Sequence, residues 1–392
     1  MEKHKESIGE NRQNAIPNAK TSGSRTPNVP ALRFPEFTGE WRFVHLEEVA
    51  EFQKQRIFTA LLNNGNYIST ENILQNFEGI QYSSSIPANT NVIEYQKGDI
   101  LLSNIRPYLK KVWFADRKGG CSADVFVLRG DKCDQHFLYY VIASNRFINY
   151  VMSGAKGVKM PRGDKSQMEK YAFSIPTNTE QRKIAKFLSM LDERIRLQNK
   201  IIEDLKKLKS ALYQEMFGSL VAPTSKLGQV AEIVKGKQVN GTELLEQGDY
   251  YVMNGGTLPS GWLNKFNTEA NTISISEGGN SCGYVQYNTS RYWSGGHCYS
   301  LKILHPQEVS DLYLYHFLKW QEGNIMALRI GSGLPNIQKK DLRHFPIILP
   351  TITKQKSIIS VLTAIDAKIA CEVSLTEYYT MQKDFLLRDL FI

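Results

Sequence analysis

Two stretches of the chain, residues 161–217 and 335–391, are copies of each other at a constant offset of 174 residues and align without a gap. The matched positions include three polar pairs: Gln181 and Gln355, Asp192 and Asp366, Lys209 and Lys383. A period this long is too large for a solenoid repeat and indicates a globular module joined to a connecting helix. We therefore expect two similar modules in a pseudo-two-fold molecule, which suits a target with two half-sites.

Each copy contains a long run with helical periodicity that follows a proline. Thr179–Phe217 contains no glycine or proline before Gly218, and Thr353–Phe391 is the matching run in the second copy. At about 1.5 Å per residue, a helix of this length spans about 57 Å, far longer than an average globular helix. We expect Thr179 to cap the first helix at its N-terminus and Gly218 to end it.

The apolar positions of both runs form a heptad seam, which needs a partner helix. The predicted seam residues are Leu188, Leu191, Ile195, Ile202, Leu205 and Leu212 in the first run, and Leu362, Ile365, Ile369 and Leu386 in the second. Gln198 and Lys209 interrupt the first seam. The simplest pairing is antiparallel, between the two helices of one chain; a homodimeric coiled coil is the alternative. Further apolar residues outside the seam, such as Ile201 and Leu208, indicate that the pair binds another protein.

The segments between these helices are mixed. The first module contains predicted strands at Gly98–Ile105 and Ala123–Leu128 and a helix at Phe137–Val151; the second contains strands at Thr272–Ser276 and Cys298–Leu304 and a helix at Leu312–Ala327. The helical parts repeat well, whereas the residues of the strands and loops diverge. This divergence predicts one scaffold that carries two different surfaces.

These patterns predict an α+β fold of two similar mixed α/β modules, each followed by a long helix, with the helices paired as an antiparallel coiled coil. The predicted divisions are a disordered polar tail at 1–30, a first module at 31–177, a long helix at 178–220, a second module at 221–351 and a second long helix at 352–392.

Composition favours a polyanionic partner. The net charge is +9 and the sequence pI about 9.1, which points to nucleic acid first and to an anionic membrane surface second. No stretch approaches the roughly 20 apolar residues of a membrane span, and the N-terminus does not resemble a signal peptide. The five cysteines contain no Cys-x-x-Cys pair. We therefore expect free thiols, no metal site and a cytoplasmic protein.

Catalytic signatures are missing from the sequence. It contains no P-loop and no Asn/Asp-Pro-Pro-Tyr/Phe tetrapeptide of the kind that holds a target amine in methyltransferases. His297 beside Cys298 has no visible partner set and reads better as part of a strand. We expect no catalytic residues in this chain.

Basic and amide side chains gather in loops at equivalent places of the two modules. Lysine and arginine neutralise phosphates, while arginine, asparagine and glutamine can pair with base edges. The candidate DNA-binding residues are Arg106, Lys110, Lys111, Lys156, Lys159, Arg162 and Lys165 in the first module, and Arg329, Asn336, Gln338, Lys339 and Lys340 in the second. Solvated loops are the alternative for any single residue.

Several segments resemble the DNA-specificity subunit of type I restriction–modification systems, over residues 31–392. They are PALRFPEFTGEW, the pair IPTNTEQRKIAKFLSMLDERI and LPTITKQKSIISVLTAID, and the loops MPRGDKSQMEKYAFSIP and LPNIQKKDLRHFPIILP. The combination of proline, glutamine, an aliphatic helix and Asp-x-x-Ile, present twice at this period, is specific to that family. The polar N-terminal tail and the weak middle of the second seam depart from the family pattern.

The resemblance implies a division of labour. Each module would be a target recognition domain that reads one half of a split, asymmetric DNA sequence, and the long helices would set the unread gap and dock two modification (adenine methyltransferase) subunits. Restriction (helicase–nuclease) subunits would complete the complex. S-adenosylmethionine, ATP and magnesium would then be cofactors of the partner subunits, not of this chain. A stand-alone DNA-binding regulator and a coiled-coil scaffold with incidental charge are the competing interpretations.

Overall fold

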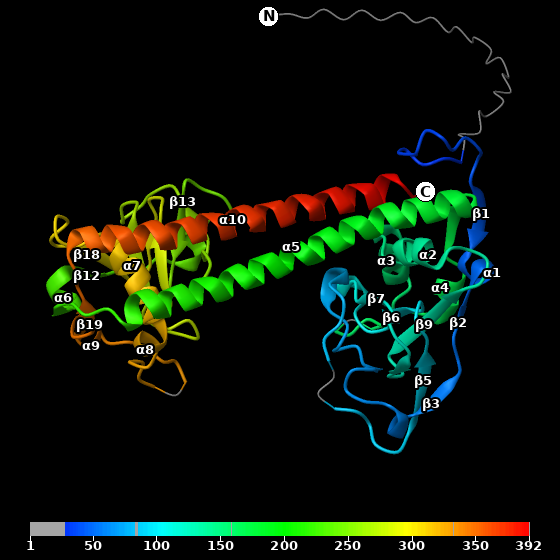
Figure 1. Ribbon diagram of the computed structural model, residues 1–392, viewed down its shortest axis with the longest axis horizontal. Helices are drawn as coiled ribbons and strands as arrows, with labels where there is room; N and C mark the ends of the chain where they lie inside the picture. Colours follow the sequence, from blue (N-terminus) through cyan, green and yellow to red (C-terminus); the bar gives the residue numbers. More distant parts are fainter. Residues whose placement is uncertain (1–27, 83–84, 158, 332, 392) are drawn as a thin grey trace, which may run out of the picture. The chain divides into compact units, whose positions relative to one another are not determined.

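The structure is a computed structural model that describes residues 28–82, 85–157, 159–331 and 333–391 (Figure 1). The chain divides into two compact units: unit 1 is Met1–Asp192 with Met381–Ile392, and unit 2 is Glu193–Thr380. Most of the tail predicted at residues 1–30 lies outside the described residues. No helix among the described residues is long and apolar enough to cross a membrane.

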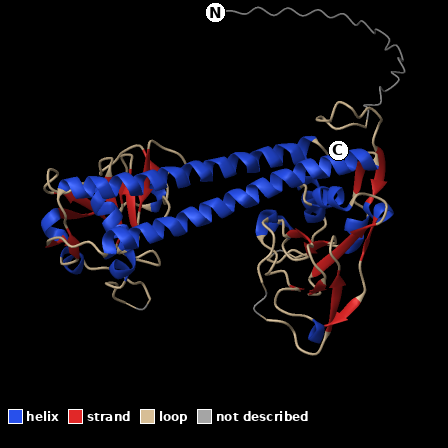
Figure 2. Cartoon of the chain, in the orientation of Figure 1, coloured by secondary structure: helices blue, strands red, loops and turns tan. Residues whose placement is uncertain are grey.

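Unit 1 mixes short strands with short helices (Figure 2). Its elements, in order, are β1 Arg42–His45, α1 Leu46–Val49, β2 Ala50–Phe52, β3 Arg56–Phe58, η1 Thr59–Leu61, β4 Tyr67–Ile68, η2 Gln75–Phe77, β5 Asn91–Tyr95, β6 Ile100–Ser103, η3 Pro107–Leu109, β7 Val112–Phe114, β8 Gly119–Cys121, β9 Val125–Gly130, α2 Gln135–Ile142, α3 Asn145–Ser153, α4 Lys165–Glu169 and β10 Ala172–Ile175. The long helix α5, Asn178–Gly218, begins in this unit.

Unit 2 has a similar order of elements. They are β11 Thr224–Lys226, α6 Leu227–Val230, β12 Ala231–Lys235, η4 Gly241–Glu243, β13 Tyr250–Met253, β14 Trp262–Leu263, β15 Thr272–Ser276, β16 Val285–Asn288, β17 Trp293–Ser294, β18 Cys298–Ile303, α7 Asp311–Trp320, α8 Glu322–Met326, α9 Lys339–Arg343 and β19 Pro346–Ile348. The second long helix, α10, spans Ile352–Asp389.

One antiparallel sheet has the same topology in both units. Its strand order is β2-β9-β6-β7 in unit 1 and β12-β18-β15-β16 in unit 2, and a two-stranded ladder, β1-β10 or β11-β19, accompanies it. This sheet fits the expectation of one scaffold with divergent residues, because its backbone pairing repeats although its residues differ. The second sheet does diverge: β3-β5-β8-β4 has four strands, and its counterpart β14-β13-β17 has three.

The two predicted medium-length helices are each broken in two. Phe137–Val151 divides into α2 and α3 because Ser144 adopts an extended conformation and its hydroxyl accepts a hydrogen bond from the Phe147 amide at 3.2 Å. Leu312–Ala327 divides at Gln321 into α7 and α8. The predicted cap at Thr179 is wrong by two positions, since α5 starts at Asn178 and the Thr177 hydroxyl faces the Glu180 amide.

The core of each unit includes both long helices. In unit 1, Ile184 and Leu188 of α5, Leu386 of α10 and Leu390 directly after α10 are buried with α2, α3 and the sheet. In unit 2, the same role falls to Tyr213 and Phe217 of α5 and to Ile358 and Leu362 of α10. Burying a large apolar side chain contributes about 1.5–3 kcal/mol, so these contacts fix the helix ends to the modules.

The predicted seam residues face inward to different degrees. Five of them are buried: Leu188, Ile202, Leu362, Ile365 and Leu386. The other five are half-buried: Leu191, Ile195, Leu205, Leu212 and Ile369. A two-helix seam cannot bury its flanks as a globular core does, which accounts for the partial exposure.

Polar residues of the helix pair meet partners that the repeat makes equivalent. The contacts are Gln198 with Glu372 and Lys209 with Asp366 in unit 2, and Lys383 with Asp192 in unit 1. Lys383 lies 174 residues after Lys209, and Asp192 lies 174 residues before Asp366, so these two ion pairs are equivalent in the repeat. Gln198 and Glu372 are also 174 residues apart, so this pair joins two equivalent positions. Within unit 2, positions on α10 fall as those on α5 rise. The helices therefore pair antiparallel within one chain, as predicted, and buried polar pairs of this kind specify register.

Equivalent glutamines hold the modules against the helices. The Gln181 side chain accepts from the Asp134 amide at 2.8 Å and donates to the Pro176 carbonyl at 2.8 Å. In unit 2, the Gln355 side chain accepts from the Ser310 amide at 2.9 Å and likewise donates to a proline carbonyl, that of residue 350. Asp134 and Ser310 directly precede α2 and α7, so each glutamine binds the start of a module helix.

Candidate nucleic-acid interface

In unit 1, two loops that carry predicted DNA-binding residues are hydrogen-bonded to each other. The main-chain carbonyl of Asn104, directly after β6, accepts from the Gly163 amide at 3.0 Å, and the Arg106 amide donates to the Pro161 carbonyl at 2.8 Å. Lys156 and Arg162 exchange two further main-chain hydrogen bonds, of 3.0 and 2.9 Å. These contacts bring the backbones of positions 106, 156 and 162 together, although some 50 residues separate the two segments in sequence.

Unit 2 contains the same pair of loops after β15. The Ile337 amide donates to the Glu277 carbonyl at 2.8 Å, and the Gly279 amide to the Pro335 carbonyl at 3.0 Å. Ile330 and Asn336 exchange two hydrogen bonds of 2.8 and 3.0 Å. The φ angles of Gly157 in unit 1 and Gly331 in unit 2 are +96° and +102°, which glycine adopts without strain. We call each set of four hydrogen bonds and its two segments the paired loops.

Different side chains stand at equivalent positions of the two paired loops. Position 162 is arginine and its equivalent 336 is asparagine; Lys156 corresponds to Ile330. Arginine and asparagine are side chains that pair bidentately with guanine and with adenine, respectively, in the major groove. Because the frame consists of main-chain hydrogen bonds, it keeps its geometry when these side chains change.

The cations of the first paired loops have acidic neighbours. Arg162 Nη1 lies 2.9 Å from Asp124 Oδ1, and Lys156 Nζ lies 3.0 Å from Asp164 Oδ2. The Lys156 and Arg162 side chains remain 83% and 54% exposed. Lys156 and hydrogen bonds from the Gln167 and Ser166 amides lower the pKa of Asp164, which keeps that carboxylate ionised. The sequence does not predict Asp124, since nothing in it links that residue to a partner 38 positions away.

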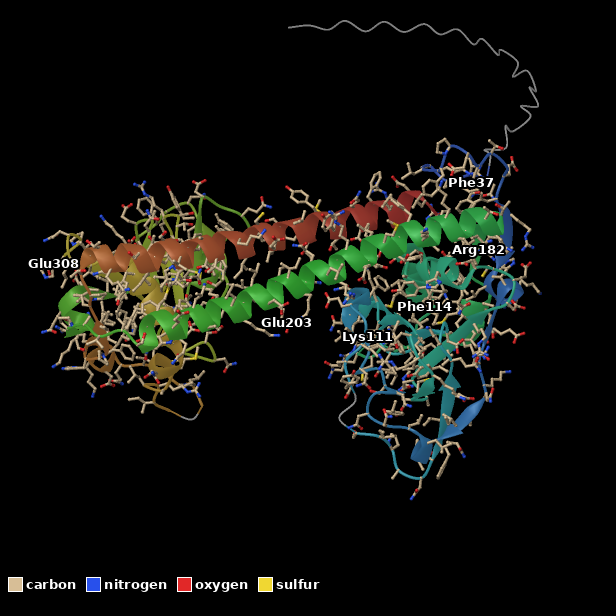
Figure 3. All side chains as sticks on the ribbon, in the orientation of Figure 1. Phe37, Lys111, Phe114, Arg182, Glu203 and Glu308 are labelled. Carbon is tan, nitrogen blue, oxygen red and sulfur yellow. The ribbon has the colours of Figure 1, made fainter. Side chains whose placement is uncertain are left out.

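The remaining candidates of unit 1 differ in accessibility. Arg106 and Lys159 are exposed. Lys110 and Lys165 are half-buried, and the Lys165 ammonium lies over the Phe52 ring at 5.1 Å. Lys111, labelled in Figure 3, donates to the Thr70 carbonyl at 2.7 Å, and burial lowers its pKa.

In unit 2 the candidates Arg329, Asn336, Gln338, Lys339 and Lys340 are all exposed. Among the described residues the Asn336 side chain makes no hydrogen bond, so its amide is available to a ligand. Lys339 and Lys340 line a pocket of about 470 Å³ that also contains Lys226, Arg343 and His344. The sequence places Arg343 in the same basic loop but does not single out Lys226, because β11 and α9 come together across more than 100 residues.

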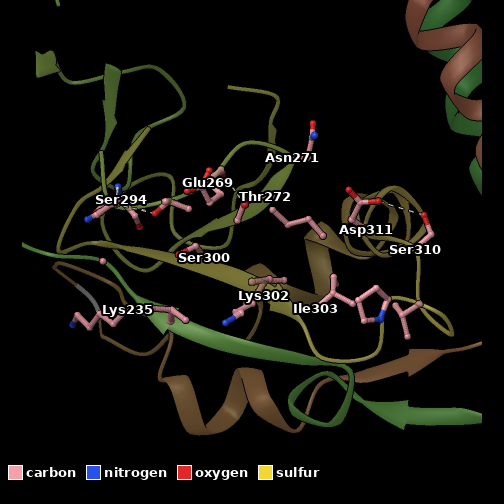
Figure 4. Close-up of a pocket in the computed structure, with 18 of the residues that line it drawn as sticks. Lys235, Glu269, Asn271, Thr272, Ser294, Ser300, Lys302, Ile303, Ser310 and Asp311 are labelled. Atoms are coloured by element: carbon pink, nitrogen blue, oxygen red, sulfur yellow. Dashed lines mark hydrogen bonds between the residues drawn. The ribbon is translucent and has the colours of Figure 1, made fainter. Parts of the chain in front are cut away.

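A larger groove of about 940 Å³ lies on one face of the main sheet of unit 2 (Figure 4). On that face the register places Ser274 beside Ser300 and Gln286, where unit 1 has Leu101, Val127 and Trp113. Those apolar residues belong to a buried cluster in unit 1. The two aspartate and glutamate side chains of the groove are engaged, Glu269 by Arg291 and Asp311 by Tyr287. The groove itself is lined by both polar and apolar side chains, such as Ser300 and Ile303, and offers no free acid–base pair among its described residues.

The described residues contain no cluster of three or more potential metal ligands. His297 and Cys298 differ in environment: Cys298 is buried in β18, where burial raises its pKa to about 11, so its thiol is not a nucleophile. All five cysteines are free thiols.

Comparison with known proteins supports the resemblance. A family model described as the type I restriction modification DNA specificity domain matches residues 38–207 and again residues 223–377. A Mycoplasma pneumoniae protein provisionally named a type I specificity subunit is 36% identical over 166 residues, 42% of this chain and 44% of that protein. The specificity subunit of the Escherichia coli EcoDI enzyme is 25% identical over 165 residues, 40% of this chain and 36% of its own. These matches span less than half the length of either relative.

Solved structures show the same fold. The crystal structure of a type I restriction–modification S subunit from M. genitalium matches with a TM-score of 0.65 at 20% identity and covers 93% of this chain and 99% of its own. A chain from a structure of a type I system assembly matches with a TM-score of 0.55 at 18% identity, over 88% of this chain and 96% of its own. The two segments matched by the family model include most of the chain and both paired loops, and the chain therefore belongs to the family of type I restriction–modification DNA specificity domains, of which it carries two.

Proposed function

We propose that this chain is the DNA-specificity subunit of a type I restriction–modification complex, and that the paired loops of each unit read one half of a bipartite, asymmetric DNA sequence. The observation that carries the proposal is the repetition of one main-chain frame with different base-pairing side chains, Arg162 and Asn336. A repeated enzyme site would keep its reactive side chains, whereas a repeated reading site must change them to read two different half-sequences.

The proposed contacts divide by chemistry. Exposed lysines such as Lys156 and Lys340 neutralise phosphates, which supplies affinity without sequence preference. Arg162 and Asn336 contact base edges, which supplies discrimination. Lys111 would have to break its hydrogen bond to the Thr70 carbonyl to take part. The other candidates flank these positions: Arg106, Lys110, Lys159, Lys165, Arg329, Gln338 and Lys339.

The long helices dock the partners and set the gap. Apolar side chains that are 40–69% exposed lie along them: Leu197, Ile201 and Leu208 on α5, and Val361, Tyr378, Met381 and Phe385 on α10. Exposed apolar surface that gathers on one element is typical of a protein-docking site. Two modification subunits would bind here, and restriction subunits would join them.

The chain itself is a non-catalytic subunit in this proposal. S-adenosylmethionine, ATP and magnesium belong to the modification and restriction subunits, and this chain supplies only the choice of site. Family membership and the fold support a DNA-recognition role, and the family supports the proposed partner subunits.

The test is to map methylated adenines in the host genome with and without this gene. We expect one bipartite motif, two short specified sequences separated by a fixed gap, to lose its methylation when the gene is deleted. Methylation that stays unchanged at every motif, together with altered transcription near bound sites, would favour a stand-alone regulator and contradict the proposal.

A further inference from the structure

The pocket beside the second paired loops carries only positive formal charge. Its lining is Lys226, Gly228, Gln229, Lys339, Lys340, Arg343 and His344, with a volume of about 470 Å³. It therefore contains four permanent cations and no aspartate or glutamate. None of these cations forms an ion pair with any residue that the structure describes.

The scaffold of the pocket is built from main-chain contacts. Lys226 pairs with Pro346 in the β11–β19 ladder, and the Leu227 amide donates to the Phe345 carbonyl at 2.8 Å. These contacts set α6 against α9. A Cβ at Gly228 would lie 3.1–3.2 Å from three atoms of Arg343, so glycine lets the arginine side chain lie close across α6.

The first unit has the same scaffold with the opposite charge. His45 pairs with Ala172, and the Leu46 amide donates to the Tyr171 carbonyl at 2.9 Å, as at Lys226 and Leu227. Glu47, Glu48 and Glu169 supply three carboxylates against two lysines, Lys165 and Lys170. Lys165 lies 3.8 Å from Glu169, and His45 Nδ1 lies 3.1 Å from Glu48. The positions equivalent to the pocket lining are His45, Glu47, Glu48, Lys165, Ser166, Glu169 and Lys170.

We propose that the pocket of unit 2 is a phosphate-binding site that holds the DNA backbone beside the half-site read by that unit, and that unit 1 has no such site. The identity of the ligand rests on the proposed function. α9 begins directly after Gln338, so Lys339 and Lys340 lie only three and four positions after Asn336 of the second paired loops. Nδ1 of His344 donates to the Lys340 carbonyl at 2.7 Å, which orients the ring at the rim of the pocket.

Charge distinguishes the two units in their attraction for a phosphate. Uncompensated lysine and arginine side chains attract a phosphate strongly, and each phosphate that they neutralise releases counterions. In unit 1 the three carboxylates outnumber the two lysines, so these positions would repel the same phosphate and the two half-sites would be held unequally. The two units thus share one scaffold but bind the DNA backbone with different strength.

The experiment uses the full chain with its modification subunits and a duplex that carries the methylated motif. Single phosphates are replaced in turn by uncharged methylphosphonates, and the affinity is measured for each duplex. We expect one or two positions beside the half-site of unit 2 to weaken binding, and the matching positions beside the other half-site to have little effect. In the double variant K226Q/R343Q, these positions should no longer have an effect.

Salt dependence provides the second readout. K226Q/R343Q should lower the slope of log affinity against log salt by about 0.9 for each phosphate that the variant no longer neutralises, equally for cognate and unrelated DNA. The control K265Q/R291Q also removes one lysine and one arginine from unit 2, but these two side chains already form ion pairs, with Glu243 and Glu269 respectively. It should keep the slope of the parent protein.

Several outcomes would overturn the proposal. A parent-like slope and methylphosphonate profile in K226Q/R343Q would show that DNA does not contact the pocket, and an equal change in the control would show a general charge effect. Inorganic phosphate that binds the pocket without displacing the duplex would assign it to a free anion. Loss of modification-subunit binding with unchanged duplex affinity would assign it to a protein. Failure of the proposed function is separate, since the parent protein would then bind no DNA sequence selectively.

Discussion

At the scale of the residue, we predict that positions 162 and 336 determine which bases the two units recognise. Replacing Arg162 by alanine should reduce discrimination at one base pair of one half-site by about 1–3 kcal/mol, and replacing Asn336 should do the same in the other half-site. Lys156→Ala is the control: it should weaken binding to all sequences alike and reduce the salt slope by about one unit. Competition between cognate duplexes and duplexes with single substitutions measures both effects. Equal losses for all sequences in the Arg162 variant would show that it binds phosphate.

A second residue-scale prediction concerns acid stability. Burial lowers the pKa of His316 from 6.5 to about 4, against the opposing influence of Asp366, and its Nδ1 lies 3.1 Å from the Tyr213 hydroxyl. The unfolded chain therefore takes up this proton below about pH 6.5 and the folded chain only below about pH 4. Stability should fall by roughly 3 kcal/mol between these values. Urea unfolding of His316→Gln across this range should lack that part of the decline, whereas Tyr213→Phe should retain it.

At the scale of the element, the helix pair is predicted to set the gap between half-sequences. Seven residues inserted after Glu193 in α5 and seven after Thr380 in α10 preserve the heptad and lengthen both helices by about 10.5 Å. This length is about three base-pair steps. The methylated motif should keep both half-sequences and gain about three unspecified bases. Insertion in α5 alone is the contrast, because it shifts the register between the Lys209–Asp366 and Lys383–Asp192 pairs and should destabilise the protein. An unchanged gap in an active double insertion would exclude the helices as the spacer.

The helices and loops also differ in how well the sequence predicts them. The bounds of α5 are predictable to within a residue or two because glycine and proline are absent from its interior and Gly218 ends it. The break between α2 and α3 is hidden although Ser144 is a good N-cap, because the apolar pattern continues across it. The sequence predicts basic loops at equivalent places, but the hydrogen-bonded pairing of their two segments is not predictable. Their hydrogen bonds join main-chain groups, which leave no residue signature, and the partners Asp124 and Arg162 are distant in sequence.

At the scale of the whole molecule, the two modules are predicted to be exchangeable. Replacing residues 31–177 by the first module of another family member should change one half-sequence of the methylated motif and leave the other half and the gap as they were. The exchange keeps α5, so Gln181 must still accept from a main-chain amide of the new module. Methylome sequencing of cells that carry the chimera provides the measurement. A chimera that alters both half-sequences would show that the modules do not read independently.

The main-chain character of the paired loops has an evolutionary consequence. None of the four hydrogen bonds in either unit uses a side chain, so selection for folding places little restraint on the side chains at positions 156 and 162 and at their counterparts 330 and 336. Position 106 and its counterpart 279 are different, since Arg106 and Gly279 have φ angles of +50° and +77°, which most side chains disfavour. Point mutations at the first four positions alter the surface offered to DNA without a cost in stability that must first be compensated. New preferences can therefore arise by single substitutions in an already folded protein, and the duplicated frame lets one half vary while the other continues to work.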